Sequence, residues 1–444
     1  MAGGVCRRSW TDCTEEVGMT VYSEKAREFL VRHGMDAERI DPDACIGAMK
    51  AQMLSGLAGG SCSMEMIPTY LSNDGTLPRD ACAAVIDAGG TNFRRALVRF
   101  TEDGPVVSNM HKCSMPGVGE SCSWEEFIRF TADQIEPLMA WTDVIGFCFS
   151  YPADITPERD GRVVCIDKEV VVQGCEGQLV GGSLLEELER RGITGKRIVI
   201  LNDTVAVLLG GAANLDKDAY SGFIGQVSGT GTNTCASLPV KQIGKLGLEG
   251  EGGMVVNLES GSYDGIRGGD FDRMLDASSH APGTKLFEKL TAGVYLGSLA
   301  RLMLQGAVEE DLLSDDCAAH VRSMPRIDAS VIDAWASGEG FSLLGGDEDD
   351  HAFAQELSLA LFRRSARCMC TNLLAIAELA DCGKDRPMCV LAEGSLVQKG
   401  RHYRPELERL LDEYGYKRRG RRLALHVGEE TTIPGAAAAA LLNA

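Results

Sequence analysis

Hydrophobic and polar residues alternate along this chain with two different spacings. A helical period opens the chain over 23–34 and 43–57, and Pro68 then breaks any helix. From residue 81 onwards, short apolar runs typical of strands alternate with helical patterns. The predicted strands are 81–88, 94–100, 143–150 and 196–201, and the predicted helices are 124–139, 183–192 and 205–214. This alternation predicts an α/β architecture, and we place a first α/β domain at 81–219.

A second α/β round occupies the rest of the chain. Its predicted strands are 221–227, 232–238, 254–258, 387–391 and 423–427, with 232–238 as a hairpin partner of the first. Its predicted helices are 284–305, the longest pattern in the chain, 405–414 and 435–442. The segment 314–350 is predicted to be loop-rich.

The composition excludes several classes of function. The chain has 444 residues with 44 basic and 64 acidic side chains, so its net charge is −20. Nucleic-acid binding needs clustered Lys and Arg, so we predict no nucleic-acid partner, although backbone N–H groups can still bind a small anion. No apolar run approaches the roughly 20 residues of a membrane helix, and the first residues do not resemble a secretory signal. With 16 Cys and no Cys-x-x-Cys pair, we expect reduced thiols and a cytoplasmic protein.

The strongest local signal is the segment 87–94, Asp-Ala-Gly-Gly-Thr-Asn-Phe-Arg, at the end of a predicted strand. Its two glycines let the backbone approach an anion closely, so the turn is a candidate phosphate loop. Asp87 is suitably placed to hold a hydrated Mg²⁺ over the phosphates. An ordinary hairpin turn explains the same residues equally well.

A second candidate phosphate loop is the segment 227–233, Val-Ser-Gly-Thr-Gly-Thr-Asn. It lacks the Gly-Lys-Ser/Thr ending of a Walker loop and is not a dinucleotide fingerprint. Its Gly-Thr-Asn ending echoes the Gly-Thr-Asn of the first loop, at a similar place in the second α/β round. A duplicated unit with one phosphate loop in each half explains the echo, and so does chance.

The segment 202–204, Asn-Asp-Thr, follows a predicted strand and precedes a predicted helix. Open α/β sheets bind ligands at such strand ends, where Asp203 can accept a proton from a substrate hydroxyl. A helix N-cap is the better explanation of Asp203 in isolation.

Lys168, beyond the Ser150-Tyr-Pro segment, is either a contact to a transferring phosphoryl group or a solvated lysine. Two charged runs, 417–422 and 347–350, are predicted to be solvated loops.

Taken in order, these segments resemble the hexokinase family of sugar kinases. The resemblance runs from 66–70, Met-Ile-Pro-Thr-Tyr, to 435–437, Gly-Ala-Ala. It includes both loops and the segments 146–152, 202–204, 257–259, 282–289, 295–297 and 393–396. The family implies a duplicated, ribonuclease-H-like, actin-like ATPase fold with a cleft between two domains. The small domain is then 81–219, the large domain is 1–80 with 220–444, and helix 435–442 is a candidate to pack back on the small domain.

The resemblance also implies ATP-dependent phosphorylation of a hexose, glucose by default, at its 6-hydroxyl. Asp203 is implied as the general base, with Lys168 as a second catalytic residue. The implied sugar-binding residues are Ser150, Asp167, Lys168, Asn202, Asp203, Asn233, Glu259 and Glu288. The implied residues for ATP are Asp87, Gly89, Gly90, Thr91, Asn92, Arg94, Gly229, Thr230, Gly394 and Ser395. Asp87 is implied to hold Mg²⁺ through water, and no oligomeric state is predicted.

Three positions depart from the family pattern in segments expected near the sugar. Asp167 and Lys285 stand where the family usually has Thr and Gln, and Ser260 stands where it has Trp. Asp167 and Lys285 are of opposite charge, so one hypothesis is that they pair with each other. An alternative is that Asp167 binds a different group on the sugar, such as an amine. Two further functions remain open: a catalytically silent sugar sensor, and an actin-like kinase or ATPase with another acceptor.

Overall fold

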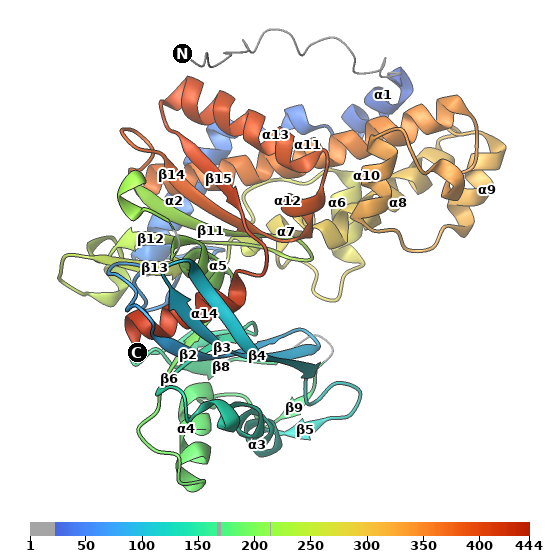
Figure 1. Cartoon of the computed structure of the whole chain (residues 1–444). Helices are drawn as coiled ribbons and strands as arrows, with labels where there is room; N and C mark the ends of the chain where they lie inside the picture. The colour runs from blue at the N-terminus through green and yellow to red at the C-terminus, as the bar shows by residue number, and fades with distance from the viewer. Residues whose placement is uncertain (1–22, 167–169, 214) are drawn as a thin grey trace, which may run out of the picture.

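The computed structural model describes residues 23–166, 170–213 and 215–444, and it contains two large β-sheets (Figure 1). The five-stranded sheet, in the lower half of the view, has the order β10-β6-β2-β3-β4. Its strands are β2 (Cys82–Gly89), β3 (Asn92–Thr101), β4 (Gly104–Ser114), β6 (Val144–Phe149) and β10 (Arg197–Leu201). Strands β2, β6 and β10 are parallel, and β3 and β4 extend the sheet as an antiparallel meander.

The six-stranded sheet, in the upper half, has the order β1-β13-β12-β11-β14-β15. Its strands are β1 (Ile67–Pro68), β11 (Gly222–Ser228), β12 (Thr232–Pro239), β13 (Gly253–Asn257), β14 (Met388–Glu393) and β15 (Leu423–Val427). Strands β11, β14 and β15 are parallel, and β12 and β13 form the antiparallel meander. Apart from β1, this is the topology of the five-stranded sheet repeated, so the predicted duplicated fold is confirmed. Both candidate phosphate loops connect the first two strands of their sheet.

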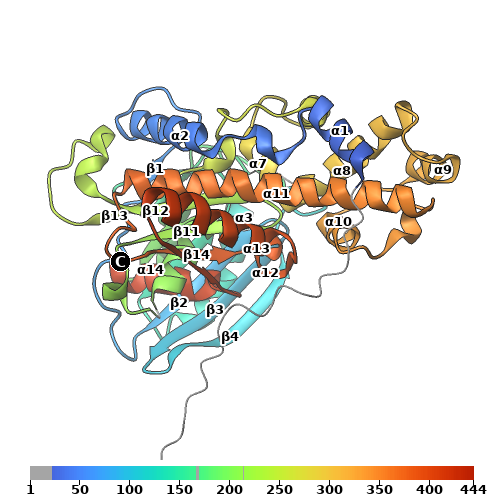
Figure 2. The same cartoon turned by 90° about the horizontal axis from the view of Figure 1, so that it is seen from above.

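Short strand pairs and fourteen α-helices make up most of the remaining regular structure of the described ranges. The short pairs are β5 (Cys122–Ser123) with β9 (Val172–Gln173), and β7 (Ala153–Ile155) with β8 (Gly161–Val163). The helices are α1 (Glu24–Arg32), α2 (Pro42–Leu57), α3 (Trp124–Ile135), α4 (Val180–Arg190), α5 (Asp203–Ala212), α6 (Asp270–Ala277), α7 (Leu286–Thr291), α8 (Gly293–Glu309), α9 (Asp315–Ser323), α10 (Ala329–Ala336), α11 (Glu348–Leu379), α12 (Ser395–Lys399), α13 (Tyr403–Leu410) and α14 (Thr432–Asn443). Figure 2 shows the long α11 running across the molecule, packed against α2 and α13.

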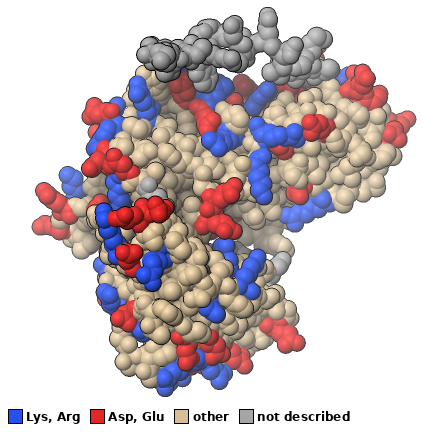
Figure 3. Space-filling view, in the orientation of Figure 1, with Lys and Arg blue, Asp and Glu red and all other residues tan. Residues whose placement is uncertain are grey.

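Helices α5 and α14 lie between the two sheets and pack against each other. Small residues make this close packing possible. A Cβ added to Gly435 of α14 would lie 1.9 Å from the carbonyl oxygen of Ala206 in α5, and one added to Gly146 of β6 would lie 2.0 Å from that of Ala436. The C-terminal helix therefore rests directly on the five-stranded sheet. In the same orientation, the surface is indented on the right between the upper and lower halves (Figure 3).

Two sequence predictions about helices are wrong, and one long helix was missed. The pattern at 284–305 is two helices, because Ala292 is extended (φ −80°, ψ 142°) and the N–H of Gly293 donates to the carbonyl of Gly229. The supposedly loop-rich 314–350 contains α9, α10 and the start of α11. The longest helix, α11, was missed because it is buried on nearly every side and so lacks an amphipathic period.

Of the two charged runs, the acidic one is not a solvated loop, whereas the basic one is exposed as predicted except at Arg419 and Arg421. Asp347 caps α11 in a capping box, and Asp350 is buried, accepting from Ser314. In the basic run, Arg421 is largely buried and pairs with Asp381. On the face seen in Figure 3, basic and acidic side chains of the described residues are interspersed. Within the described ranges, no helix is both long enough and apolar enough to cross a bilayer.

Candidate active site

The parallel strands of the five-stranded sheet bring three predicted site segments to one edge. Asp87 of β2 is level with Cys148 of β6, which is level with Leu201 of β10. Ser150 follows β6, and Asp203 begins α5 directly after β10. Because the carboxyl ends of parallel strands meet at the same edge, these polar side chains gather there.

The fully buried Cys148 thiol lies within the electrostatic field of both carboxylates, Asp87 and Asp203. Burial raises the pKa of Cys148 well above its ordinary value, and the charges of Asp87 and Asp203 raise it further. The pKa of Cys235, on β12 of the other sheet, is raised in the same way by burial and additionally by Asp203. Asp203 therefore lies where the two sheets approach each other, because the carbonyl of its neighbour Thr204 accepts from the Cys235 thiol of β12 at 3.2 Å.

Asn202, rather than Asp203, caps helix α5. The side-chain oxygen of Asn202 accepts from the N–H of Thr204 at 2.8 Å. Asp203 is the first helical residue, and its Oδ1 accepts from the N–H and the hydroxyl of Thr204, at 2.7 and 3.2 Å. The N-cap explanation of Asp203 is thus wrong. As the first residue of α5, Asp203 lies at the N-terminal end of the helix, beside the carboxyl end of β10.

The first candidate loop is the tight turn between β2 and β3. Asp87 is 6% exposed and accepts from Arg94, its cross-strand neighbour, at 2.7 Å to Nε and 2.5 Å to Nη2. Gly90 has a left-handed backbone (φ 60°), and a Cβ there would meet no atom within 4 Å. Its carbonyl accepts from the Tyr151 hydroxyl at 2.6 Å. The turn is thus anchored on one side and open on the other, as anion binding requires. Gly89, Thr91 and Asn92 belong to the same turn.

The second candidate loop lies against the turn between β14 and α12. A Cβ on Gly229 would lie 3.2 Å from both the Cα of Gly394 and the backbone nitrogen of Ser395. Gly394 has φ 120°, and a Cβ there would lie 2.4 Å from the carbonyl oxygen of Ser228, so the two turns need glycine at this crossing. Thr230, at the tip of the loop, is exposed. The structure thus brings together the four predicted nucleotide residues of this half of the chain.

The predicted sugar residues of the six-stranded sheet form a hydrogen-bonded cluster. The Asn233 amide donates to Oε1 of Glu259 at 3.1 Å and to Oδ1 of Asn257 at 2.9 Å. Asn257 also donates to Oε1 of Glu259, at 2.9 Å. The backbone N–H of Ser260, a buried residue, donates to Oδ1 of Asn233 at 3.2 Å. Asn257 was absent from the predicted site, although it lies two residues before Glu259.

Glu288 lies beside the second loop, where its Oε2 accepts from the N–H of Thr232 at 3.0 Å. Lys285, on the same segment, donates to Oε2 of Glu259 at 2.7 Å. The hypothesis that Lys285 pairs with Asp167 is not tested, because Asp167 and Lys168 lie outside the described residues.

Glu65, an exposed residue that sequence reasoning missed, adds a further negative charge near this cluster. Partial desolvation of its carboxyl group and the charge of Glu259 raise its pKa, and Lys285 opposes this rise. Its one signal in the sequence was its place directly before the 66–70 segment.

The comparisons with known proteins decide the family. Two family models, both described as hexokinase, match residues 26–213 and 223–442. The chain belongs to the hexokinase family. Membership makes it a phosphotransferase that acts on a hexose hydroxyl, and the predicted resemblance is confirmed.

Relatives and solved structures of the hexokinase family agree with this assignment. Hexokinase-1 of Nicotiana tabacum is 27% identical over 435 residues, which cover 88% of this chain and 86% of that protein. Hexokinase-3 of Rattus norvegicus is 32% identical over 271 residues, which cover 58% of this chain and 28% of that protein. The structure of a hexokinase from Schistosoma mansoni complexed with glucose has a TM-score of 0.73 at 23% identity, covering 94% of this chain and 98% of the other. This last likeness confirms the two-domain fold.

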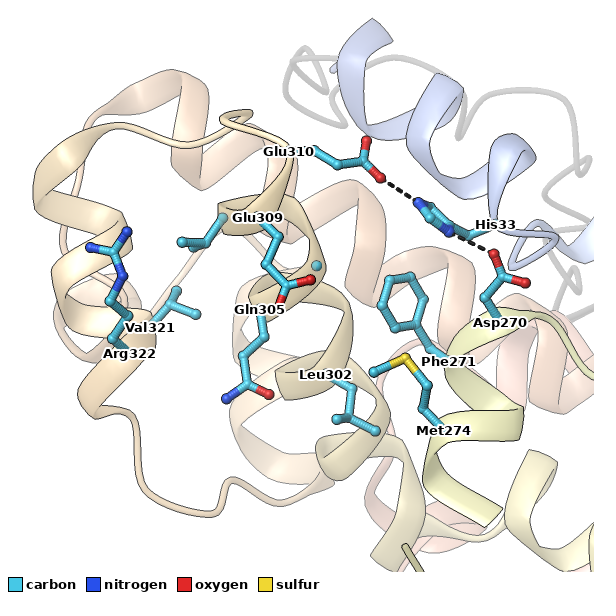
Figure 4. A pocket seen from close by; sticks show the side chains of 12 residues that line it. His33, Asp270, Phe271, Met274, Leu302, Gln305, Glu309, Glu310, Val321 and Arg322 are labelled. Atoms are coloured by element: carbon cyan, nitrogen blue, oxygen red, sulfur yellow. Dashed lines mark hydrogen bonds and ion pairs between the residues drawn. The ribbon is translucent and has the colours of Figure 1, made fainter. Parts of the chain in front are cut away.

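A cavity of about 570 Å³ lies elsewhere in this hexokinase-family fold, among α1, α6, α8 and α9 (Figure 4). His33 bridges two carboxylates at its rim, with Nδ1 2.8 Å from Asp270 and Nε2 2.6 Å from Glu310. None of the predicted site residues lines this cavity.

Proposed function

We propose that this chain transfers the terminal phosphoryl group of ATP to the 6-hydroxyl of a hexose, with glucose as the default substrate. The observation that carries the proposal is the position of Asp203, which follows β10 at the edge where β2 and β6 also end and lies beside β12 of the other sheet. In this proposal the Asp203 carboxylate accepts the hydroxyl proton while the oxygen attacks phosphorus.

The sugar is proposed to lie against the cluster of Asn233, Glu259 and Glu288, together with Asn202 and Ser150. Each sugar hydroxyl both donates and accepts, so amides beside carboxylates suit it. Asp167 and Lys168 are proposed to reach the sugar from the small domain. That domain is proposed to comprise 81–219, with 1–80 and 220–444 as the large domain, and its closure on the sugar would exclude water.

ATP is proposed to lie between the two glycine turns, with its nucleoside near Gly394 and Ser395. The residues fit a hydrated Mg²⁺ held mainly by the phosphates. Asp87 offers one carboxylate, already paired with Arg94, and the described residues contain no group of three His, Cys, Asp or Glu placed to hold a metal. Such an ion neutralises charge on the transferring phosphoryl group.

The test is ADP release measured with a panel of hexoses, on the wild type and on Asp203→Asn. We expect Asp203→Asn to lower kcat by about 10²- to 10⁴-fold, the usual contribution of a general base, while calorimetric binding of the sugar remains measurable. Asp103→Asn, in the exposed turn between β3 and β4, is the matched control and should keep wild-type rates.

Each other outcome would change either the proposed mechanism or the proposed function. A near-normal rate of Asp203→Asn would remove this residue from the mechanism. ATP turnover without sugar would indicate an ATPase, and sugar binding without turnover would indicate a sensor.

A further inference from the structure

Lys285 and Glu259 form a polar contact whose two members both have an unusual backbone. The Lys285 ammonium lies 2.7 Å from Oε2 of Glu259. Glu259 has φ 54° and Lys285 has φ 50°, so both are in the left-handed region that residues other than glycine seldom adopt. Such strain persists where the surrounding structure holds it and is common at ligand sites. The fold therefore fixes the backbone of both residues of this pair.

The contact leaves the two oxygens of Glu259 with different neighbours. Oε1 accepts from the amides of Asn233 and Asn257, whereas Oε2 accepts from Lys285. The Lys285 side chain is 40% exposed, so a bound sugar can reach both Oε2 and the ammonium.

The surroundings of the pair are acidic. Burial works against the charge of Lys285, but Glu259, Glu65 and Glu288 together raise its pKa. Without Lys285, this end of the site would present several carboxylates and would attract cations.

Lys289, one turn further along α7, has a different role. Its ammonium is buried and donates to Asp276, to the Ser279 hydroxyl and to the carbonyl of Ala281, all within 2.9 Å. Lys289 holds its own segment together, whereas Lys285 points into the Glu259 cluster.

We propose that Lys285 is a specificity-determining residue that excludes cationic amino sugars from the Glu259 end of the site and favours neutral hydroxyls. A sugar hydroxyl can donate to Oε2 of Glu259 and accept from the Lys285 ammonium at the same time. An ammonium group can only donate, and the charge of Lys285 repels it. This inference rests on the proposed hexose site and adds a substrate preference to it.

The experiment compares Lys285→Gln and Lys285→Met with the wild type. The substrates are glucose and the 2-, 3- and 4-amino-deoxyglucoses, at a pH where the amines are protonated. We expect both variants to raise kcat/KM for at least one amino sugar relative to glucose by about tenfold, which corresponds to about 1.4 kcal/mol. Lys285→Met should also raise the KM for glucose, because it removes the donor that Gln keeps.

Lys245→Gln is the matched control. Lys245 is exposed and also lies in the field of Glu65, but its ammonium contacts the backbone carbonyl of Glu65 rather than Glu259. Its amine-to-glucose ratio should stay within about twofold of wild type, as expected for an exposed, screened charge. An unchanged ratio in both Lys285 variants, or an equal rise in Lys245→Gln, would overturn the proposal.

Binding measured by calorimetry separates this inference from the proposed function. If the chain binds glucose without phosphorylating it, the proposed function fails, and the binding ratio of amino sugar to glucose still decides the role of Lys285. If wild type and variants bind no hexose, both proposals are wrong. Thermal unfolding of each variant shows whether a change in ratio comes with a folded protein.

Discussion

The substitution Gly435→Ala tests how tightly the C-terminal helix is packed between the two sheets. The added Cβ would lie 1.9 Å from the carbonyl oxygen of Ala206. Ordinary contacts of carbon with a carbonyl oxygen begin near about 3.3 Å, so α14 would have to move away from α5 by more than about 1 Å. The added Cβ is fixed rigidly to the backbone of α14 and the carbonyl oxygen belongs to the backbone of α5, so no side-chain rotation can relieve the contact.

Two opposing effects determine how much Gly435→Ala changes the free energy of unfolding. Overpacking of a dense core costs about 1–3 kcal/mol, and this contact lies at the upper end because it is between backbones. Ala stabilises a helix relative to Gly by about 1 kcal/mol. We therefore expect Gly435→Ala to lower the free energy of unfolding by about 2 kcal/mol.

Gly47→Ala in α2 is the matched control, since a Cβ at Gly47 would meet no atom within 4 Å. Only the helix propensity acts there, so this variant should be about 1 kcal/mol more stable than wild type. Urea unfolding followed by circular dichroism gives both midpoints. An equal rise of the midpoint in both variants would refute the close packing of α14 on α5.

Two further predictions concern ion pairs outside the site. Arg364 donates two hydrogen bonds, of 2.7 and 2.8 Å, to the buried Asp272. Arg364→Met leaves this carboxylate buried without its partner, so we expect it to lower the free energy of unfolding, measured in urea, by about 3–5 kcal/mol. The double variant Arg364→Met/Asp272→Asn should recover most of this loss, because it also removes the buried charge. If the double variant is as unstable as the single one, the uncompensated charge is not the cause. The hydrogen bonds of His33 lower the pKa of Asp270 and of Glu310. The stability that these hydrogen bonds contribute is therefore fully present at a pH above the ordinary carboxyl pKa, and it is lost as the pH falls through the lowered pKa of each group. His33→Gln should therefore be less stable than wild type at pH 6, with the difference shrinking at acid pH in thermal unfolding; a constant difference would contradict this linkage.

Local patterns were sufficient for the strands and turns that carry the candidate site. The runs before Asp87 and Asn202 are apolar on both sides, as strands buried in a parallel sheet require, and both Gly-Thr turns follow such strands. Sequence reasoning could place Asp203 at a strand end because that position depends on a few neighbouring residues. The echo between the two loops indicated a duplication that the repeated strand order confirms.

Helices buried on all sides could not be found in this way. An amphipathic period arises only where one face of a helix meets water, and α11 has almost no such face. The break between α7 and α8 has a tertiary cause, because Gly293 donates to Gly229, 64 positions earlier in the chain.

The partners within the site were likewise decided by the tertiary structure. Asn233, Asn257 and Glu259 meet because β12 and β13 pair in one particular register, and a shift by one residue would turn these side chains to opposite faces. By itself the sequence determined the family, the strands that carry the candidate site and the positions of the two glycine turns, since these depend on short segments. The contact of Lys285 with Glu259 and the place of Asp203 where the two sheets approach each other depend on the packing of distant segments, and only the folded chain could decide them.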